Sequence, residues 1–295
     1  MYKIRKWCKM LFGNSIYHVV QGEGGCYSRD DIKGYYNDLT EKVLRDDKDI
    51  LVPKYDINGG GERYFSIGVF QYGLAAWDLY LKTGADEYRE KTFACAEWAI
   101  DNQQKNGGWI TFNHKNIEHS YSSMAQGEAI SLLVRCYRET GDLKYLTAAE
   151  KAEKFMILPI SEGGTASYEN GGLTFYESTE DPLILNGWIF SLWGIFDYFK
   201  CTGDVAAGEI LDKTLSTLRN RLPEFDCGYW SKYDTGKRIS SEFYHKLHIA
   251  QLKTMYDLFG DDIYRQYSER WQKFALSRVK KTRAFIVKAI QKVRE

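Results

Sequence analysis

The chain has no long apolar run, no net charge and no paired cysteines, and each absence excludes a class of protein. None of its apolar stretches approaches the ~20 residues that a membrane-spanning helix needs. Its 40 basic and 40 acidic residues leave a formal net charge of +0, so no global field favours nucleic acid. Its six cysteines show no CxxC spacing; Cys95, Cys136 and Cys201 lie within helical patterns, where we expect reduced core thiols.

Targeting and catalytic signatures are also absent. The basic N-terminus has a short apolar stretch at 10–12, but Gly13 and the two polar residues after it interrupt this stretch. No signal-peptide core forms, and we expect an intracellular, cytoplasmic chain. There is no GxSxG elbow and no Walker loop. His245 and His248 have no third ligand in local spacing, so no metal site is predicted, and capping or substrate hydrogen bonding is the favoured role.

Charge is nevertheless uneven along the chain. The first ten residues hold four basic residues and no acid, and residues 278–295 hold seven basic residues and one acid. Both ends are suited to peripheral contact with an anionic membrane surface or polymer. A solvated tail and a solvated helix face are the favoured explanation of the same pattern.

A glycine-containing turn recurs four times, at Gly84, Gly141, Gly203 and Gly260, with roughly sixty residues between successive turns. An aromatic-rich pattern with helical spacing precedes each turn, and the first such helix is predicted to start near Ser66. Glycine is favoured at the left-handed position that ends a helix. A repeat of this length, with two helices in each unit, predicts stacked helical hairpins.

An acidic residue follows each turn glycine, and Asp86 and Asp142 are predicted to cap the helices that return. Four antiparallel pairs predict an all-α protein: an α/α toroid, or incomplete barrel of about four hairpins, with a short N-terminal arm. An open superhelix of hairpins is the alternative. The predicted boundaries are an arm at 1–50, a catalytic barrel at 51–277 and a basic C-terminal helix at 278–295.

Four long loops are predicted at 51–65, 106–121, 161–183 and 223–243. Each follows the second helix of a pair or the arm, so all four are expected on the same face of the array. Loops longer than about a dozen residues are usually functional, and these are rich in Gly, Tyr, Trp, Glu, Asp and His. Their convergence predicts a cleft for an extended or polar ligand.

The last two loops supply carboxylates and phenols, which suit proton transfer. A free tyrosine has a pKa near 10, so it needs a cationic neighbour to act as a base. Aromatic residues make up 15% of the chain, and such rings stack on sugar faces. Large rings also fill wide helical arrays, and both explanations apply here.

Five short motifs follow one another along the chain: FQYGL at 70–74, GGWI at 107–110, YSSMAQGEAISLLVR at 121–135, LNG at 185–187 and YHKLHIAQL at 244–252. Together they resemble the glucuronyl 5-epimerase family, whose members act on heparosan-type polysaccharides. The resemblance extends over roughly 52–277.

This resemblance implies an α/α barrel whose cleft binds a hexuronic acid polymer, such as a capsule-like heparosan. The family removes the hydrogen at carbon 5 of glucuronic acid and returns a proton to the opposite face, giving iduronic acid. Cationic and phenolic donors must then stabilise the negative charge that develops on the neighbouring carboxylate. No cofactor and no metal are expected.

Carried over residue by residue, the family's catalytic tyrosines match Tyr233 and Tyr244, and its glutamate matches Glu177. The family has a tyrosine directly after that glutamate, where this chain has Ser178. Tyr176 is the expected replacement for the missing phenol.

The loop before Asn186 is also about two residues shorter than in the family, which leaves Glu180 as an alternative to Glu177. The family arginine after Tyr233 is displaced, and Lys237 or Arg238 is expected to replace it. The other positions expected to bind substrate are Arg63, Tyr64, Gln71, Tyr72, Trp109, Tyr121, Gln126, Asn186, His245 and His248.

Animal members carry β-rich N-terminal domains that wall the cleft and help them to dimerise, whereas about fifty residues precede the barrel here. Substrate length and a homodimer are therefore left open. Two other functions also remain open at this point: a polysaccharide lyase or glycoside hydrolase on the same scaffold, and a non-catalytic glycan-binding protein.

Overall fold

The computed structural model describes residues 18–45, 49–57, 61–112 and 120–294. These residues form a mostly helical protein, and the predicted all-α class is confirmed. The helices are α2 (Glu41–Leu44), α3 (Ser66–Thr83), α4 (Asp86–Asn102), α5 (Ser123–Thr140), α6 (Leu143–Met156), α7 (Leu185–Thr202), α8 (Val205–Arg221), α9 (Glu242–Phe259), α10 (Asp262–Leu276) and α11 (Arg278–Arg294). Two short antiparallel strands, β1 (Ala166–Ser167) and β2 (Thr174–Phe175), lie between α6 and α7.

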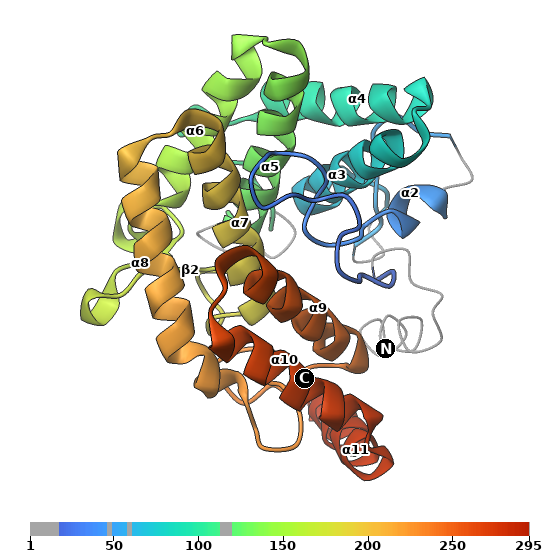
Figure 1. The fold of residues 1–295 in the computed structure, drawn as a ribbon, viewed down its shortest axis with the longest axis vertical. Coiled ribbons are helices and arrows are strands. Elements are labelled where there is room, and N and C mark those ends of the chain that lie inside the picture. Colours follow the sequence, from blue (N-terminus) through green and yellow to red (C-terminus); the bar gives the residue numbers. More distant parts are fainter. Residues whose placement is uncertain (1–17, 46–48, 58–60, 113–119, 295) are drawn as a thin grey trace.

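Four helical hairpins stand side by side as an incomplete barrel (Figure 1). The first helix of each hairpin lies inside: α3 packs against α5, α5 against α7, and α7 against α9. These inner helices are buried almost all round, whereas the returning helices α4, α6, α8 and α10 bury one face each. This difference is expected because only an outer helix has a side that faces water.

The turn glycines end the inner helices as predicted. Gly84, Gly141, Gly203 and Gly260 have φ between 67° and 74°, the left-handed region that glycine adopts without strain. The prediction for Asp142 is confirmed, because its side chain accepts a hydrogen bond from the backbone of Lys144. The prediction for Asp86 is wrong. Ala85 takes the N-cap position, because one extra residue separates Gly84 from the acid, and Asp86 becomes the first residue of α4.

The N-terminal arm closes the end of the barrel where these turns lie. Tyr35 and Tyr36 are fully buried, and the backbone N–H of Tyr35 donates to Asp78 of α3 at 2.8 Å. Thr254 of α9 donates to the carbonyl of Tyr36 at 3.2 Å. The arm therefore joins the first and last inner helices. Residues 34–39 of the arm lead into the short helix α2.

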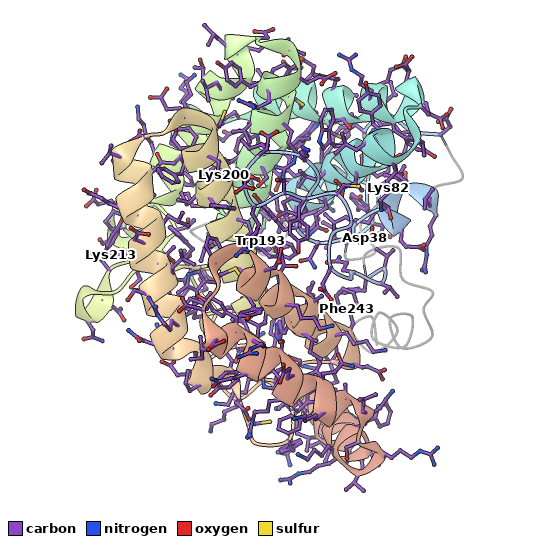
Figure 2. The ribbon with its side chains drawn as sticks, viewed as in Figure 1. Asp38, Lys82, Trp193, Lys200, Lys213 and Phe243 are labelled. Carbon is purple, nitrogen blue, oxygen red and sulfur yellow. The ribbon has the colours of Figure 1, made fainter. Side chains whose placement is uncertain are left out.

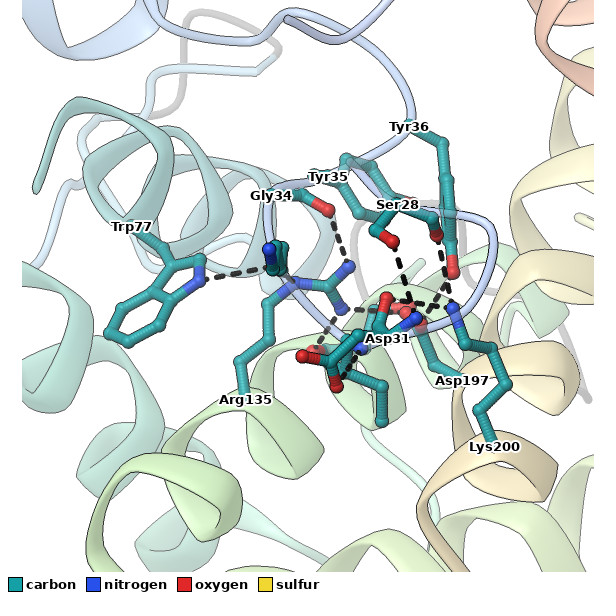
Figure 3. Close-up of polar contacts among 12 residues, drawn as sticks. Ser28, Asp31, Gly34, Tyr35, Tyr36, Trp77, Arg135, Asp197 and Lys200 are labelled. Atoms are coloured by element: carbon teal, nitrogen blue, oxygen red, sulfur yellow. Dashed lines mark hydrogen bonds and ion pairs between the residues drawn. The ribbon is translucent and has the colours of Figure 1, made fainter. Parts of the chain in front are cut away.

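A buried guanidinium holds the arm in place (Figure 3). Arg135 of α5 donates to the carbonyls of Lys33 and Gly34, both at 2.9 Å, and to Asp197 of α7 at 2.6 Å. Asp197 also accepts a hydrogen bond from Tyr36 at 2.6 Å. Arg135 and Asp197 have no exposed side-chain surface, so the backbone of the arm takes part in satisfying a buried ion pair.

Two peripheral contacts extend this attachment. Lys200 of α7 donates to the carbonyls of Ser28 and Asp31, and Asp38 forms an ion pair with Lys82 at 3.8 Å (Figure 2). Lys200 is partly buried and its two hydrogen bonds go to backbone carbonyls, whereas the Asp38–Lys82 ion pair lies nearer the surface, where ion pairs contribute little. Arm docking therefore depends mainly on Arg135 and its partners.

Two further sequence-based predictions concern thiols and membranes. Cys95 and Cys136 are free and buried, as expected, whereas Cys201 is free and only partly buried. Across the described ranges, no helix combines the length and the apolarity required to cross a bilayer. The basic N-terminus falls at 1–17, outside the described residues.

Candidate active site

A cavity of about 250 Å³ lies at the opposite end of the barrel from the glycine turns. Each of the four predicted long loops contributes at least one residue to it, although Phe243, from the predicted loop 223–243, lies in the first turn of α9. The first two turns of the inner helices supply others. The predicted convergence of the loops on one cavity is therefore observed, and the starts of the inner helices join them. The lining residues are His18, Gln21, Lys42, Tyr55, Ile57, Phe65, Ile67, Gly68, Gln71, Phe112, Met124, Glu177, Asn186, Phe190, Phe243, Tyr244 and Leu247.

Glu177 reaches the cavity from the loop before α7. The backbone of the preceding residue is fixed on both sides, because Tyr176 N–H donates to Thr165 O at 2.9 Å and Tyr176 O accepts from Ser123 N–H at 3.0 Å. Gly187 lies directly against the glutamate: a Cβ atom there would come within 2.6 Å of Glu177 Cβ. A side chain at this position would displace the carboxyl group, so glycine is what allows the approach.

Tyr244 lies in the first turn of α9, which begins after Ser241, whose side chain caps the backbone of Tyr244. Its ring makes an edge contact with Tyr233, with centroids 4.7 Å apart. Burial, followed by the charge of Glu177, raises the pKa of both tyrosines well above the usual range. Three residues distant in sequence are thus brought together, and both phenols keep their protons at neutral pH.

Arg238 is the cation beside this pair. Its guanidinium lies 5.3 Å from the centroid of the Tyr233 ring, and it forms ion pairs with Asp234 and Asp181. Its charge opposes the rise in the pKa of both tyrosines, but burial dominates. Lys237 and Arg238 are the two cations expected to replace the family arginine, and Arg238 is the one that lies beside the tyrosine pair. The side chain of Lys237 is exposed.

Amide and charged groups from three elements meet in the same cavity. Gln71 of α3 lines it and donates through Nε2 to Glu128 Oε1 of α5 at 2.7 Å. Burial raises the pKa of Glu128 well above its usual range, so a protonated carboxyl is favoured. Lys42 of α2 also lines the cavity, and burial lowers its pKa to about 8 although Glu128 opposes this. Asn186, in the first turn of α7, completes this polar group.

Sequence reasoning missed the contribution of the arm. His18 Nε2 lies 3.4 Å from the Tyr244 hydroxyl, and its imidazole makes an edge contact with Phe243, 5.1 Å away. Gln21 and Lys42 also line the cavity from this segment. The arm has weak periodicity, and its only local signals are single polar residues among apolar ones. Isolated polar residues of this kind can be assigned to the cavity only when the position of the arm on the barrel is known.

Other expected residues lie away from the cavity. Tyr176 is the clearest case. In its extended segment adjacent side chains alternate, and the phenol lies near Glu169 and Arg221, whose charges act on its pKa. Glu180, the alternative to Glu177, is exposed. Neither residue is among those that line the cavity in the part of the chain that the structure describes.

The two histidines of α9 are buried behind the cavity wall. His245 hydrogen-bonds through Nδ1 to Ser231 Oγ at 2.8 Å and through Nε2 to the carbonyl of Trp271 at 3.0 Å. Its ring stacks on Trp230 at 3.6 Å. His248 lies 3.2 Å from the same serine hydroxyl. Burial lowers the pKa of each imidazole to about 3, so both are neutral, and they hold the last loop against α9 and α10.

The remaining expected substrate-binding residues have structural partners. Trp109 is buried and donates to Ala99 O at 2.7 Å, Tyr72 donates to Ile50 O at 3.0 Å, and Gln126 donates to Ser122 O at 3.1 Å. The others lie in the loops. Tyr64 is 44% exposed and packs against Trp98, Arg63 pairs its backbone with Tyr55, and Tyr121 packs against Phe155. Gln71 and Asn186 are thus the two of this set that line the cavity.

In the described ranges, no group of three or more His, Cys, Asp and Glu side chains is arranged to hold a metal ion. The groups that line the cavity include the carboxyl group of Glu177, the protonated phenol of Tyr244, a lysine of lowered pKa and several amides. Tyr233 packs against the Tyr244 ring but is not among the lining residues. The lining groups can take a proton from a carbon acid, return one, and bind a carboxylate.

Comparison with known proteins gives matches over most of the barrel. The sequence model of the family described as D-glucuronyl C5-epimerase C-terminus matches residues 103–273. The D-glucuronyl C5-epimerase of Caenorhabditis elegans is 26% identical over 219 residues, which cover 64% of this chain and 36% of the worm enzyme. The chain thus matches about a third of that relative's length. An uncharacterised protein of Methanocaldococcus jannaschii is 30% identical over 222 residues, or 72% of this chain and 68% of that protein.

Among solved structures, the GH76A α-1,6-mannanase from Salegentibacter is similar with a TM-score of 0.51 and 16% sequence identity. The match covers 72% of this chain and 64% of the mannanase. Similarity at this level concerns the fold alone, and it agrees with an α/α toroid.

Proposed function

Because the chain belongs to the family of the D-glucuronyl C5-epimerase C-terminus, we propose that it inverts carbon 5 of glucuronic acid residues in a heparosan-like polysaccharide, giving iduronic acid. One observation carries the proposal: Glu177 and Tyr244, matched from the family's motifs, line one cavity from different elements. Inversion needs a base for one face of the sugar and an acid for the other.

In this proposal Glu177 is the base. It takes the hydrogen at carbon 5 as a proton, and the electron pair of the broken C–H bond moves into the adjacent carboxylate. Tyr244 is the acid, because its raised pKa keeps the phenol protonated. Its proton goes to the opposite face of carbon 5, the electron pair returns to form the new C–H bond, and a phenolate remains. Glu177 then releases the proton it took to water, and Tyr233, against the Tyr244 ring, and His18, 3.4 Å from its hydroxyl, are proposed to relay a proton from water to the phenolate.

Lys42 is proposed to bind the carboxylate of the reacting sugar. The charge on that group increases when carbon 5 loses its proton, so a nearby cation lowers the barrier. Glu128 raises the pKa of Lys42 against the effect of burial, which favours the charged ammonium. Gln71 and Asn186 line the same cavity and supply amide groups for the same carboxylate.

The test is proton NMR of unsulfated heparosan incubated with the protein in deuterium oxide. We expect the carbon-5 proton signal to fall and iduronate resonances to appear. Glu177→Gln and Tyr244→Phe should each lower the rate by about a hundredfold or more. Tyr256→Phe is the matched control, since it makes the same change three turns further along α9. Tyr176→Phe should also retain activity, because Tyr176 lies away from the cavity. The motif comparison, which gave Tyr176 the role of the missing phenol, predicts instead that this variant loses activity.

Other results would overturn the proposal in distinguishable ways. An unsaturated product that absorbs in the ultraviolet would indicate a lyase, and new reducing ends would indicate a hydrolase. Polymer binding without exchange, unchanged in Glu177→Gln, would indicate a glycan-binding protein. Wild-type activity of Tyr244→Phe would contradict the assigned acid.

A further inference from the structure

The last helix, α11, is attached to the rest of the protein through one face. Lys288 Nζ donates to Ile239 O at 2.7 Å, and Gln291 Oε1 accepts from Ile239 N–H at 3.1 Å. Ala284 and Lys288 are buried on this face. The contacts fix α11 to the loop between α8 and α9, at one end of the molecule's long axis beyond α10 (Figure 1).

The opposite face carries an apolar stripe that is exposed to solvent. Val279 is 80% exposed, Ile286 53%, Ile290 47% and Val293 77%. Their spacings of seven, four and three residues place all four on one side of the helix. Scattered exposed apolar residues need no explanation, but a continuous stripe indicates an interaction surface.

Basic residues flank this stripe on both sides. At about 100° per residue, Arg283 and Arg294 lie along one edge and Arg278 along the other. All three are exposed, and the sequence from Arg278 to Arg294 contains no acid. An amphipathic helix with an apolar stripe between cations has the pattern of a helix that lies in the surface of an anionic bilayer.

We propose that α11 docks the protein on an anionic lipid surface, with the stripe Val279–Ile286–Ile290–Val293 inserted between the headgroups. Anionic headgroups complement the exposed arginines Arg278, Arg283 and Arg294 beside the stripe, and the acyl region takes the apolar side chains. A soluble polyanion would bind the basic side chains but would leave the apolar stripe exposed to water. A second copy of α11 would bring two clusters of like charge together. The docking goes beyond the epimerase reaction and does not depend on it.

The experiment is co-sedimentation of the full chain with vesicles of phosphatidylcholine alone or with phosphatidylglycerol added. We expect binding to the mixed vesicles that weakens as salt is raised, and little binding to the neutral ones. The variant Ile286→Ser/Ile290→Ser should bind at least tenfold more weakly. Val205→Ser is the matched control, since this valine is 74% exposed at the start of α8.

Each alternative gives its own result. Equal binding by the double variant and the wild-type chain would mean that charge alone acts, and would overturn docking through the stripe. A dimer in light scattering that the double variant converts to a monomer, with no vesicle binding, would assign the stripe to a second copy. Activity on soluble heparosan should be the same in the double variant, so failure of this proposal is separable from failure of the proposed function.

Discussion

Replacing Arg135 with methionine should detach the N-terminal arm while the helical barrel stays folded. The guanidinium donates to the carbonyls of Lys33 and Gly34 at 2.9 Å each; the bond to Gly34 is buried and the bond to Lys33 is partly buried. A hydrogen bond from a charged donor contributes about 1.5–3 kcal/mol, so the two together hold the arm by roughly 4 kcal/mol. Their loss should raise the open population of the arm by about a thousandfold.

The same change also leaves the carboxylate of Asp197 buried without its ion-pair partner, which costs about 3–5 kcal/mol. The double variant Arg135→Met/Asp197→Asn should recover part of this loss. A neutral amide is less costly to bury than an unpaired carboxylate, and its oxygen still accepts the hydrogen bond from Tyr36.

Amide hydrogen exchange of the full chain is the assay. In Arg135→Met, protection should fall at residues 24–44 far more than in α7. Activity on heparosan should fall with it, because Lys42 and His18 lie on the arm. Trp77→Phe is the matched control: it removes one bond to Lys33 O, 3.1 Å long, and should cost about 1 kcal/mol. Unchanged exchange at 24–44, or equal loss of protection throughout the chain, would refute the reasoning.

Three other predictions concern the cavity and its support. Gly187→Ala should lower kcat at least tenfold by displacing Glu177, while the circular dichroism spectrum stays unchanged. Gly22→Ala is the control: no atom lies within 4 Å of its new methyl group, so kcat should not change. The KM for polymer should rise above about pH 8, because Lys42 loses its proton there. Lys42→Arg should move this rise to higher pH. If the pH profile of KM in Lys42→Arg were identical to that of the wild-type chain, Lys42 would not be the group that binds the sugar carboxylate. The two buried histidines of α9 have folded pKa values of about 3, below the unfolded 6.5, so their stabilisation is present above pH 6.5 and is lost as pH falls towards 3. Urea unfolding should therefore show about 4 kcal/mol less stability at pH 5 than at pH 7, and an unchanged midpoint would contradict it.

Local chemistry in the sequence was enough to predict the hairpins. Glycine at Gly84 and its equivalents marks a left-handed backbone position, and that preference acts within a few residues, so helix ends can be read without knowing the fold. The exception, Asp86, came from a single extra residue in the turn. Family phrases likewise predicted Glu177 and Tyr244, and both line the cavity.

Only the tertiary structure decided which neighbours of those residues share the cavity. Tyr176 precedes Glu177, yet alternation in extended backbone directs the two side chains to different surroundings. His245 follows Tyr244, yet the turn of α9 buries the imidazole against Trp271.

The contribution of His18 and Lys42 was equally hidden from local analysis. Both belong to an arm whose position depends on a buried ion pair between α5 and α7, far away in sequence. Turns and caps are determined by contacts between near neighbours, so the sequence alone determined the hairpins. The composition of the cavity depends on long-range packing, which has no local signal.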